Sequence, residues 1–195
     1  VEIYNAVDVG IIREKADCFT EIQLKRPTVL FVGRLDENKD PLRALDIFHI
    51  IAGKNGLAHL YYLGKGELEA QIREKASAYG LSNRVHVLGY LENPFPVMKQ
   101  ADVCCMTSKS EGFPLSLLES VALGVPFVST EVGGARVLSN DGRCGKVYVT
   151  EEEGAEAVLG ILEMPEEVRE RECRESISRF TLDAYINRIE KLLDE

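Results

Sequence analysis

Arg34 and Lys39 are the two cations whose place in the chain best suits binding of a phosphorylated ligand. Both follow an apolar run at residues 28–33 and precede the start of a helix. A guanidinium presents a fork of donors and an ammonium presents a compact charge, so together they are able to clamp a diphosphate. Solvation of both side chains at the surface is the alternative interpretation.

Glu111 lies in a loop that combines a carboxylate with a helix start. It follows the apolar run 102–107, and Gly112 and Pro114 begin the helix predicted at 114–123. The unpaired N–H groups and the positive end of a helix dipole suit an anion. This loop is therefore a second candidate for contacts to a phosphate or a sugar.

Glu119 lies on the same helix, within or beside an apolar stripe formed by Leu115, Leu118 and Ala122. A carboxylate in such a place is costly unless hydrogen-bond donors meet it. Sugar hydroxyls are such donors, and the diol of a ribose offers two of them. A backbone amide or a cation of the protein is the alternative partner.

Glycine turns follow two further apolar runs. Gly64 and Gly66 follow the second run, and Gly133 and Gly134 follow the fifth. Glycine lets a ligand approach the backbone closely, although a plain tight turn explains Gly133 and Gly134 equally. The dinucleotide fingerprint needs a third glycine where this chain has Glu69, and no P-loop sequence occurs. We therefore exclude NAD binding and P-loop chemistry.

The remaining candidates for catalysis or metal binding are weak. His49, His59 and His86 do not cluster in the sequence, and each is interpreted as a packed or surface residue. No Asp-x-Asp, His-Glu-x-x-His or cysteine cluster indicates a metal, and no Gly-x-Ser-x-Gly turn indicates a hydrolase. We expect no metal ion and no cofactor.

The elements that must position these residues alternate along the chain. Apolar runs predict strands at 28–33, 58–63, 85–88, 102–107, 126–130 and 146–149. Caps and helical spacing predict a helix from Asp40-Pro41 to about Ile51 and others at 67–79, 94–101, 114–123, 151–162, 166–178 and 182–193. This alternation predicts an α/β fold, a Rossmann-like doubly wound parallel sheet of about six strands with helices on both faces. Ligands of such sheets bind at the carboxyl ends of the strands, where the loops described above belong.

Length and composition limit the class of partner. A chain of 195 residues fits one domain, and its net charge of −9 argues against nucleic acid but allows a small anion in one cationic pocket. Five cysteines without a Cys-x-x-Cys pair, with Cys104 and Cys105 in an apolar run, predict free thiols and a reducing compartment. Without a signal peptide or a spanning apolar stretch, we expect a cytoplasmic protein. The first residue is Val1 rather than Met, which indicates a fragment of a longer protein.

The order of these motifs resembles the C-terminal domain of family-4 retaining glycosyltransferases (glycosyl transferases group 1). Their GT-B fold places the active site between two Rossmann-like halves. The shared motifs are Gly33-Arg34-Leu35 with Lys39, Gly64-x-Gly66, Gly89, Ser108-x-x-Glu111-Gly112-Phe113 with Glu119, Gly124-x-Pro126 and Gly133-Gly134. The match covers nearly the whole chain. Tyr4 and Ala6 depart from the Pro and Gly of the family's hinge, and Val137 stands where many members have Glu.

The resemblance implies a role for each matched residue. Arg34 and Lys39 would hold the pyrophosphate of a nucleoside diphosphate sugar and stabilise the charge of the leaving group. Glu111 would accept hydroxyls of the transferred sugar, and Glu119 those of the ribose. The implied catalytic residues are Arg34, Lys39 and Glu111. The implied donor-binding residues are Gly33, Arg34, Lys39, Gly64, Gly66, Leu88, Gly89, Tyr90, Glu111, Gly112, Phe113, Pro114, Leu115 and Glu119.

The resemblance also implies how the domain is used. Residues 1–195 would form one nucleotide-sugar-binding domain, with a hinge segment at 1–25 and a crossover helix at 179–195. The acceptor, a glycan or a lipid-linked sugar, would bind an N-terminal domain that is absent here, so the isolated chain is expected to be inactive. This half would contact neither membrane nor nucleic acid, whereas a peripheral position of the full-length parent at the inner face of a membrane stays open. A sugar-nucleotide epimerase of the same architecture and a non-catalytic nucleotide-sugar-binding module are the alternatives.

Overall fold

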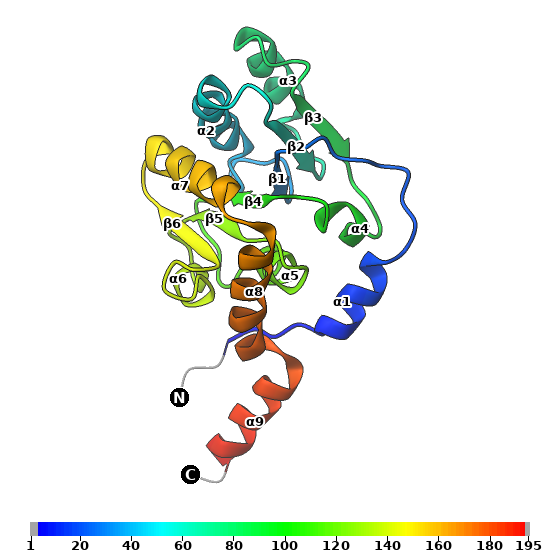
Figure 1. Ribbon diagram of the computed structural model, residues 1–195, viewed down its shortest axis with the longest axis vertical. Helices are drawn as coiled ribbons and strands as arrows, with labels where there is room; N and C mark the ends of the chain where they lie inside the picture. The colour runs from blue at the N-terminus through cyan, green and yellow to red at the C-terminus, as the bar shows by residue number, and fades with distance from the viewer. Residues whose placement is uncertain (1–3, 194–195) are drawn as a thin grey trace.

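Residues 4–193 are described by the computed structural model, which is built on a six-stranded parallel sheet (Figure 1). The strands are β1 (Thr28–Val32), β2 (His59–Leu63), β3 (Val85–Gly89), β4 (Val103–Met106), β5 (Phe127–Thr130) and β6 (Gly145–Tyr148). Their spatial order is β3-β2-β1-β4-β5-β6, so the chain reverses its direction of travel between β1 and β4. The predicted doubly wound sheet is therefore confirmed, and each strand lies within one residue of its predicted bounds.

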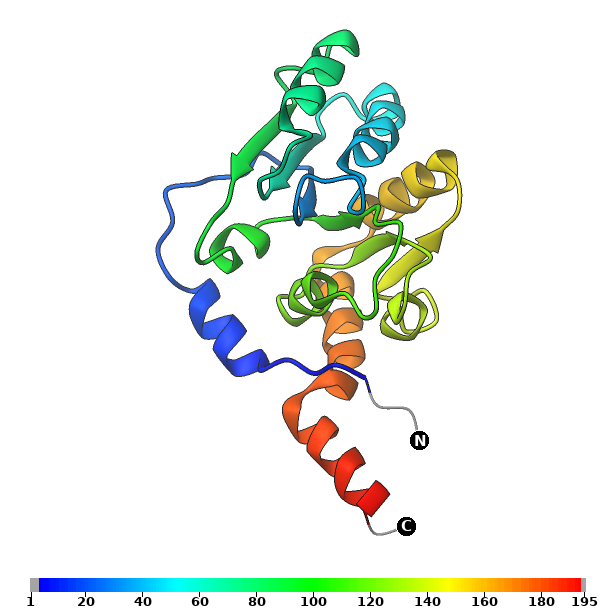
Figure 2. The same ribbon diagram turned by 180° about the vertical axis from the view of Figure 1, so that it is seen from behind.

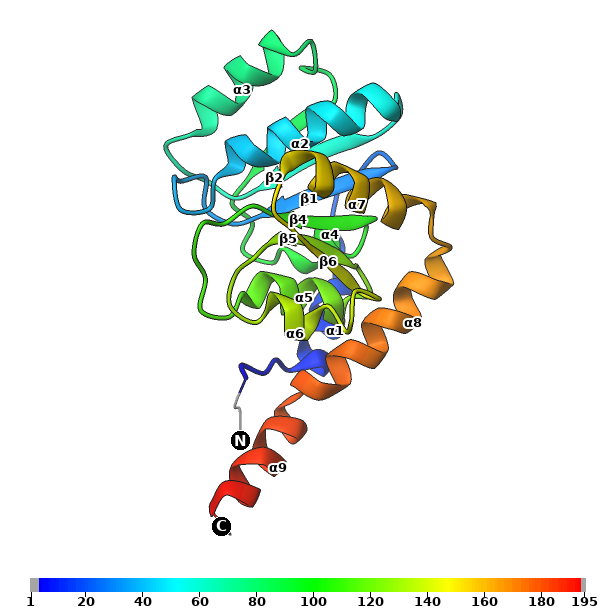
Figure 3. The same ribbon diagram turned by 90° about the vertical axis from the view of Figure 1, so that its left-hand side faces the viewer.

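Helices cover both faces of the sheet (Figures 1 and 3). One face packs against α2 (Pro41–Lys54), α3 (Glu69–Ala78) and α7 (Glu151–Glu163). The other packs against α1 (Val9–Ala16), α4 (Phe95–Met98), α5 (Leu115–Ala122), α6 (Ala135–Leu138) and α8 (Glu166–Ile177). The turn η1 (Ser178–Phe180) leads to α9 (Leu182–Leu193), which extends away from the body and has no buried residue. Among the described residues, no helix is both long and apolar enough to span a bilayer.

Side chains of each strand alternate between two cores. Phe31 of β1 enters the core beneath α2, whereas its neighbour Leu30 enters the core on the opposite face. Cys105 and Cys104 of β4 divide in the same way. Successive residues of a strand point to opposite faces, so a strand covered on both sides has a continuous apolar sequence. The predicted core position of both cysteines is confirmed, and all five cysteines are free thiols.

Local signals in the sequence set the ends of the longer helices. Asp40 precedes Pro41, and its carboxylate accepts the N–H of Arg43 at 3.3 Å, as the predicted cap requires. Gly80 and Gly124 follow α3 and α5 with φ of 70° and 83°, a region that glycine occupies without strain. These positions explain why the two helices stop where predicted.

Two short helices were not predicted, and several predicted helices differ in length from the observed ones, among them α2, which continues to Lys54. The missed helices are α1, whose first turn is capped by the Asp8 carboxylate on the N–H of Ile11 at 2.9 Å, and α6, which has 4 residues. The helices predicted at 67–79 and 94–101 span Glu69–Ala78 and Phe95–Met98, because turns occupy their ends. Helices of 8 and 4 residues are too short for a periodic apolar pattern to appear clearly.

The N-terminal segment of the described chain lies beside the root of α9, as both views show (Figures 1 and 2). The N–H of Val7 donates to the carbonyl of Phe180 at 3.0 Å, and Val7 pairs with Thr181 in an isolated parallel bridge. Val7 of the predicted hinge segment 1–25 therefore contacts the start of the predicted crossover helix 179–195. Their outermost positions, 1–3 and 194–195, lie outside the described residues.

Candidate functional site

The loops after β1 and β2 are in direct contact at the carboxyl edge of the sheet. The N–H of Leu35 donates to the carbonyl of Lys65 at 2.9 Å. A Cβ atom on Gly64 would lie 1.8 Å from the carbonyl oxygen of Gly33, and one on Gly66 would lie 2.2 Å from that of Leu35. The two glycines therefore allow two loops to pack together. From the sequence, they were predicted to let a ligand approach the backbone.

Replacing Gly64 by alanine is expected to lower the free energy of unfolding by about 1–3 kcal/mol, because the added methyl group meets backbone that cannot yield easily. The φ of 154° at Gly64 adds strain for any other residue. The measurement is the midpoint of urea unfolding. Gly160→Ala is the matched control, because Gly160 lies in α7 and a Cβ atom there would have nothing within 4 Å. The free energy of unfolding of this variant should not fall. Equal midpoints for Gly64→Ala and the wild type would contradict the packing role.

Lys39 and Glu111 form an ion pair at this edge although they belong to different halves of the sheet. Their Nζ and Oε1 atoms are 2.5 Å apart, and only 19% and 16% of the two side chains are exposed. Asn38 joins the same loops, because its carbonyl accepts the N–H of Lys109 at 2.7 Å and its side-chain amide donates to Ser110 at 3.1 Å. The structure thus brings one predicted cation and one predicted carboxylate together.

Arg34 lies beside this pair and extends into solvent. Its guanidinium is 3.1 Å from the carboxylate of Asp36, and 75% of its side chain is exposed. The stem of Lys39 passes over Gly33, where a Cβ atom would lie 3.5 Å from Cδ of the lysine. Both predicted cations therefore flank one glycine. Lys39 is already held in place, whereas packing does not hold Arg34.

Two adjoining cavities open along the carboxyl edge. The Gly33 cavity has a volume of about 400 Å³ and is lined by Val32, Gly33, Arg34, Leu63, Gly64, Lys65, Tyr90, Leu91 and Pro94. The Glu119 cavity has a volume of about 540 Å³ and is lined by Lys15, Tyr90, Leu91, Glu92, Asn93, Pro94, Phe95 and Glu119. Tyr90 belongs to both and is 68% exposed. An elongated ligand can therefore pass from Arg34 to Glu119 along one wall, whereas Lys39 and Glu111 line neither cavity.

Glu119 is a half-buried carboxylate that faces its cavity with no hydrogen-bond donor among residues 4–193. Burial raises its pKa above the ordinary value for a glutamate. Lys15 lines the same cavity but makes no ion pair with Glu119. The alternative of a protein partner for Glu119 is therefore wrong for the part of the chain that the structure describes. Hydroxyl groups of a ligand would supply the missing donors.

The apolar stripe predicted around Glu119 is correct only in part. Leu118 and Ala122 are fully buried, but Leu115 is 51% exposed. Leu115 is the first residue of α5, so it lies at the edge of the sheet rather than against the core.

The loop that starts α5 is held by the loop after β5. The N–H of Gly133 donates to the carbonyl of Glu111 at 3.2 Å, and a Cβ atom on Gly133 would lie 2.1 Å from the carbonyl oxygen of Gly112. Pro114 is the residue before the helix, and no side chain caps the helix start. The first N–H groups of α5 therefore remain available to an anion.

The segment at the end of β3 holds three of the implied donor-binding residues, Leu88, Gly89 and Tyr90. Gly89 has a φ of 80°, and its carbonyl accepts the N–H of Gly64 at 2.8 Å. Tyr90 follows and lines both cavities. Leu88 is half-buried against the core on the α4 face and does not line either cavity. The geometry therefore favours Tyr90 over Leu88 as the residue that a planar ligand would meet.

A sequence profile of the family Glycosyl transferases group 1 matches residues 13–178, which is most of the chain. This chain belongs to the group 1 glycosyl transferases. The resemblance drawn from its motifs is confirmed. Apart from Gly124 and Pro126, which precede β5, the residues that carry it lie at the carboxyl ends of the strands, in the loops after them or on α5.

Both curated proteins and solved structures are similar to this group 1 glycosyl transferase chain. An N-acetylgalactosamine-N,N'-diacetylbacillosaminyl-diphospho-undecaprenol 4-alpha-N-acetylgalactosaminyltransferase of Campylobacter jejuni is 33% identical over 154 residues, covering 78% of this chain and 41% of that protein. The structure of the lipopolysaccharide outer core galactosyltransferase WaaB superposes with a TM-score of 0.79 at 21% identity, covering 99% of this chain and 55% of that one. Anabaena HepE in complex with UDP-glucose gives a TM-score of 0.79 at 20% identity, with 98% and 56% covered. The GT-B-type Rossmann-like fold is confirmed, and the chain spans about half the length of these relatives or less.

Two lysines of this group 1 domain were not identified from the sequence. Lys65 lines the Gly33 cavity from between Gly64 and Gly66, and its place inside a glycine turn was the available signal. Lys15 lines the Glu119 cavity from α1, which was not predicted. Asp8 as a helix cap was the signal that would have placed it.

The histidines, in contrast, lie away from the candidate site of this group 1 domain. His59 and His86 lie on neighbouring strands, with Nδ1 and Nε2 3.1 Å apart. His59 is the first residue of β2, so the pair is centred away from the carboxyl edge. Within residues 4–193, no group of three or more His, Cys, Asp or Glu is arranged to hold a metal ion.

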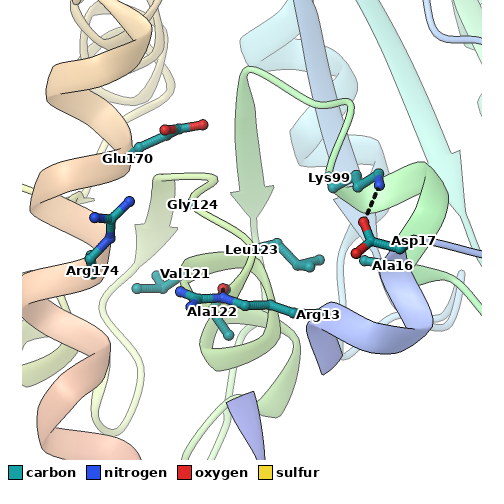
Figure 4. A pocket seen from close by; sticks show the side chains of 10 residues that line it. All are labelled: Arg13, Ala16, Asp17, Lys99, Val121, Ala122, Leu123, Gly124, Glu170 and Arg174. Atoms are coloured by element: carbon teal, nitrogen blue, oxygen red, sulfur yellow. Dashed lines mark hydrogen bonds and ion pairs between the residues drawn. The ribbon is translucent and has the colours of Figure 1, made fainter. Parts of the chain in front are cut away.

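A third cavity, of about 280 Å³, opens on the opposite edge of the sheet (Figure 4). Gly124, which precedes β5, lines it, so it lies at the amino ends of the strands. Lys99 pairs with Asp17 at 2.9 Å, and Arg13 donates to the carbonyl of Ala122 at 3.1 Å. Two of its cations are thus satisfied by the protein, and no predicted site residue lines it.

Proposed function

We propose that this chain binds a nucleoside diphosphate sugar and is the donor-binding half of a retaining glycosyltransferase. The observation that carries the proposal is the Lys39–Glu111 ion pair, which links the loop after β1 to the loop that starts α5. A diphosphate beside this pair would meet Lys39, Arg34 and the open helix start together. Such preorganised positive charge stabilises the negative charge that grows as a nucleoside diphosphate leaves.

The two cavities suggest how the rest of the donor lies. The base would pack beside Tyr90, and the ribose hydroxyls would donate to Glu119 across the Glu119 cavity. Glu111 would accept hydroxyls of the transferred sugar. Arg34 and Lys39 supply the charge at the diphosphate in this arrangement, so we propose that donor binding persists in the presence of a chelator of divalent metals.

The relatives suggest a substrate class. Structures of HepE carry UDP and UDP-glucose in their names, and the Campylobacter relative is named for a sugar linked to diphospho-undecaprenol. We propose a UDP-hexose-type donor and a glycan or lipid-linked acceptor, with the acceptor held by protein outside this chain. Retention is tested with a longer protein that includes the acceptor-binding part, by comparing the anomeric configuration of donor and product by NMR.

Calorimetric titration of the 195-residue chain with UDP, GDP and ADP sugars tests the proposal directly. A ligand present at tenfold its dissociation constant also raises stability by about 1.4 kcal/mol, which a thermal-shift screen detects. We expect saturable binding of one nucleotide class with and without EDTA. Absence of binding by all three classes would contradict the proposed function.

Arg34→Ala is expected to weaken binding of the nucleotide that titrates, by about threefold to tenfold. A charged hydrogen bond to phosphate contributes roughly 1.5–3 kcal/mol, and exposure to solvent reduces this value. Arg171→Ala is the matched control, because Arg171 is an exposed arginine on α8, away from the carboxyl edge, and its loss should leave the affinity unchanged. Equal affinities for Arg34→Ala and the wild type would show that Arg34 does not contact the donor.

A further inference from the structure

Three aromatic rings from distant parts of the chain meet beside the loop that carries Glu111. Tyr4 comes from the N-terminal segment, Phe113 from the loop before α5, and Phe180 from the turn before α9. Their ring centroids lie 5.7 Å (Tyr4–Phe113), 5.9 Å (Tyr4–Phe180) and 5.6 Å (Phe113–Phe180) apart. We call these three residues the aromatic triad. Each ring is close enough to the other two for the tilted contacts that aromatic pairs favour.

Phe113 is fixed on its other side by the loop after β5. A Cβ atom on Gly134 would lie 2.2 Å from Cδ2 of Phe113, so the ring lies directly on the backbone there. Gly134 has a φ of 78°, which suits glycine. Because Phe113 is clamped between Gly134 and the other two rings, a shift of either ring displaces Phe113 and the loop that contains it.

The triad also joins the two ends of the chain to that loop. The side-chain amide of Asn5 approaches the carbonyl of Phe113 at 3.5 Å, and the guanidinium of Arg188 lies 5.6 Å from the ring centre of Tyr4. The N–H of Val7 donates to the carbonyl of Phe180 at 3.0 Å. The N-terminal segment, the root of α9 and the Glu111 loop therefore form one connected unit.

We propose that Tyr4 is a positioning residue. Its ring transmits the positions of the N-terminal segment and of the start of α9 to Phe113, and Phe113 in turn determines the direction of the Glu111 carboxylate. The inference rests on the proposed function, in which Glu111 contacts the sugar of the donor. Phe113 is two residues from Glu111 along the chain, and Glu111 is held on its other side by Lys39 at 2.5 Å. A small displacement of the loop therefore changes this pair and the direction of the carboxylate.

The effect is expected to be larger on binding of the sugar than on binding of the nucleotide, because the nucleotide shares only the Lys39 end of this unit. Tyr90 and Arg34 belong to loops of the other half of the sheet, which the triad does not touch. Glu119 lies on α5, which is anchored in the core through Leu117 and Val121. Loosening the triad should therefore reduce the preference for a nucleotide sugar over the bare nucleotide.

The test compares UDP-glucose with UDP in calorimetric titrations of the 195-residue chain and its variants. Tyr4→Leu removes the ring, Tyr4→Phe keeps it, and Phe19→Leu removes a ring that is 87% exposed and serves as the matched control. Aromatic contacts of this kind contribute about 0.5–1.5 kcal/mol each. We expect Tyr4→Leu to weaken UDP-glucose binding by about threefold to tenfold and UDP binding by a clearly smaller factor. Phe19→Leu should match the wild type, Tyr4→Phe should keep more of the preference for UDP-glucose over UDP than Tyr4→Leu does, and Phe180→Leu should reproduce Tyr4→Leu.

The outcomes separate this inference from the proposed function. If the wild type binds neither ligand, the proposed function fails and the inference fails with it. If the wild type binds both and Tyr4→Leu leaves the ratio of the two affinities unchanged, or weakens both equally, the positioning role is overturned and the proposed function stands. Thermal unfolding of each variant verifies that the fold is retained, and Phe180→Leu provides a second test if Tyr4→Leu does not fold.

Discussion

Lys39→Met is expected to weaken UDP-glucose binding by roughly 100-fold, the largest loss for any single residue of the site. A charged hydrogen bond contributes roughly 1.5–3 kcal/mol, and one factor of ten corresponds to about 1.4 kcal/mol. Loss of the ammonium also leaves Glu111, which is only 16% exposed, as an unpaired negative charge beside the diphosphate. Both effects act against the same ligand, and calorimetry measures their sum.

Companion variants separate the two contributions. The double variant Lys39→Met, Glu111→Gln has no unpaired carboxylate, so its free energy of unfolding should be higher than that of Lys39→Met alone. Its affinity for UDP-glucose should stay low. Lys54→Met, at the exposed end of α2, controls for the loss of one positive charge elsewhere. An affinity for UDP-glucose within about threefold of the wild type in Lys39→Met would remove Lys39 from the donor site.

Glu119→Met is expected to weaken UDP binding by roughly 10- to 100-fold, because the carboxylate accepts the ribose hydroxyls in the proposed arrangement. The same variant should lose much less affinity for 2′-deoxy-UDP, which lacks one of these hydroxyls. The comparison of the two nucleotides therefore distinguishes a lost hydrogen bond from a general disturbance of the cavity. If Glu119→Met weakened both nucleotides equally, the assignment of the ribose to Glu119 would be wrong.

The raised pKa of Glu119 predicts opposite effects of pH on stability and on binding. The folded chain holds this proton more tightly than the unfolded chain, so Glu119 favours folding at low pH. This contribution is lost as pH rises through the raised pKa. Glu119→Met should therefore raise the free energy of unfolding near neutral pH. The affinity of the wild type for UDP should fall as pH drops through the raised pKa, because the ligand needs the ionised carboxylate; urea unfolding and calorimetry across pH measure both.

The positions of Lys39 and Glu111 follow from rules that operate on the sequence. Each follows an apolar run that forms a strand, and parallel strands place the loops at their carboxyl ends on one edge. Their residue types then indicate which loops carry charge. This is why an ion pair between residues 72 positions apart could be anticipated as a shared location, although not as a bond.

Other features depend on contacts that no local pattern encodes. The packing of Gly64 against Gly33 depends on how two loops approach, and the sequence shows only that both are glycines. The pair of His59 and His86 depends on the register of β2 and β3, in which Tyr61 faces His86. Register is set by packing of the sheet as a whole, so histidines distant in sequence did not indicate it. Lys15 was missed because α1 is short and its apolar pattern is weak.

The close fit of neighbouring loops also limits how specificity can be transferred among relatives. The loop after β1 fits the loop after β2 through Gly33 and Gly64, and the loop after β4 fits the loop after β5 through Gly112 and Gly133. If one loop were replaced by the loop of another enzyme, the new backbone would have to pack against the unchanged neighbouring loop. Donor preference should therefore be exchanged between homologues only when both loops of such a pair are replaced together.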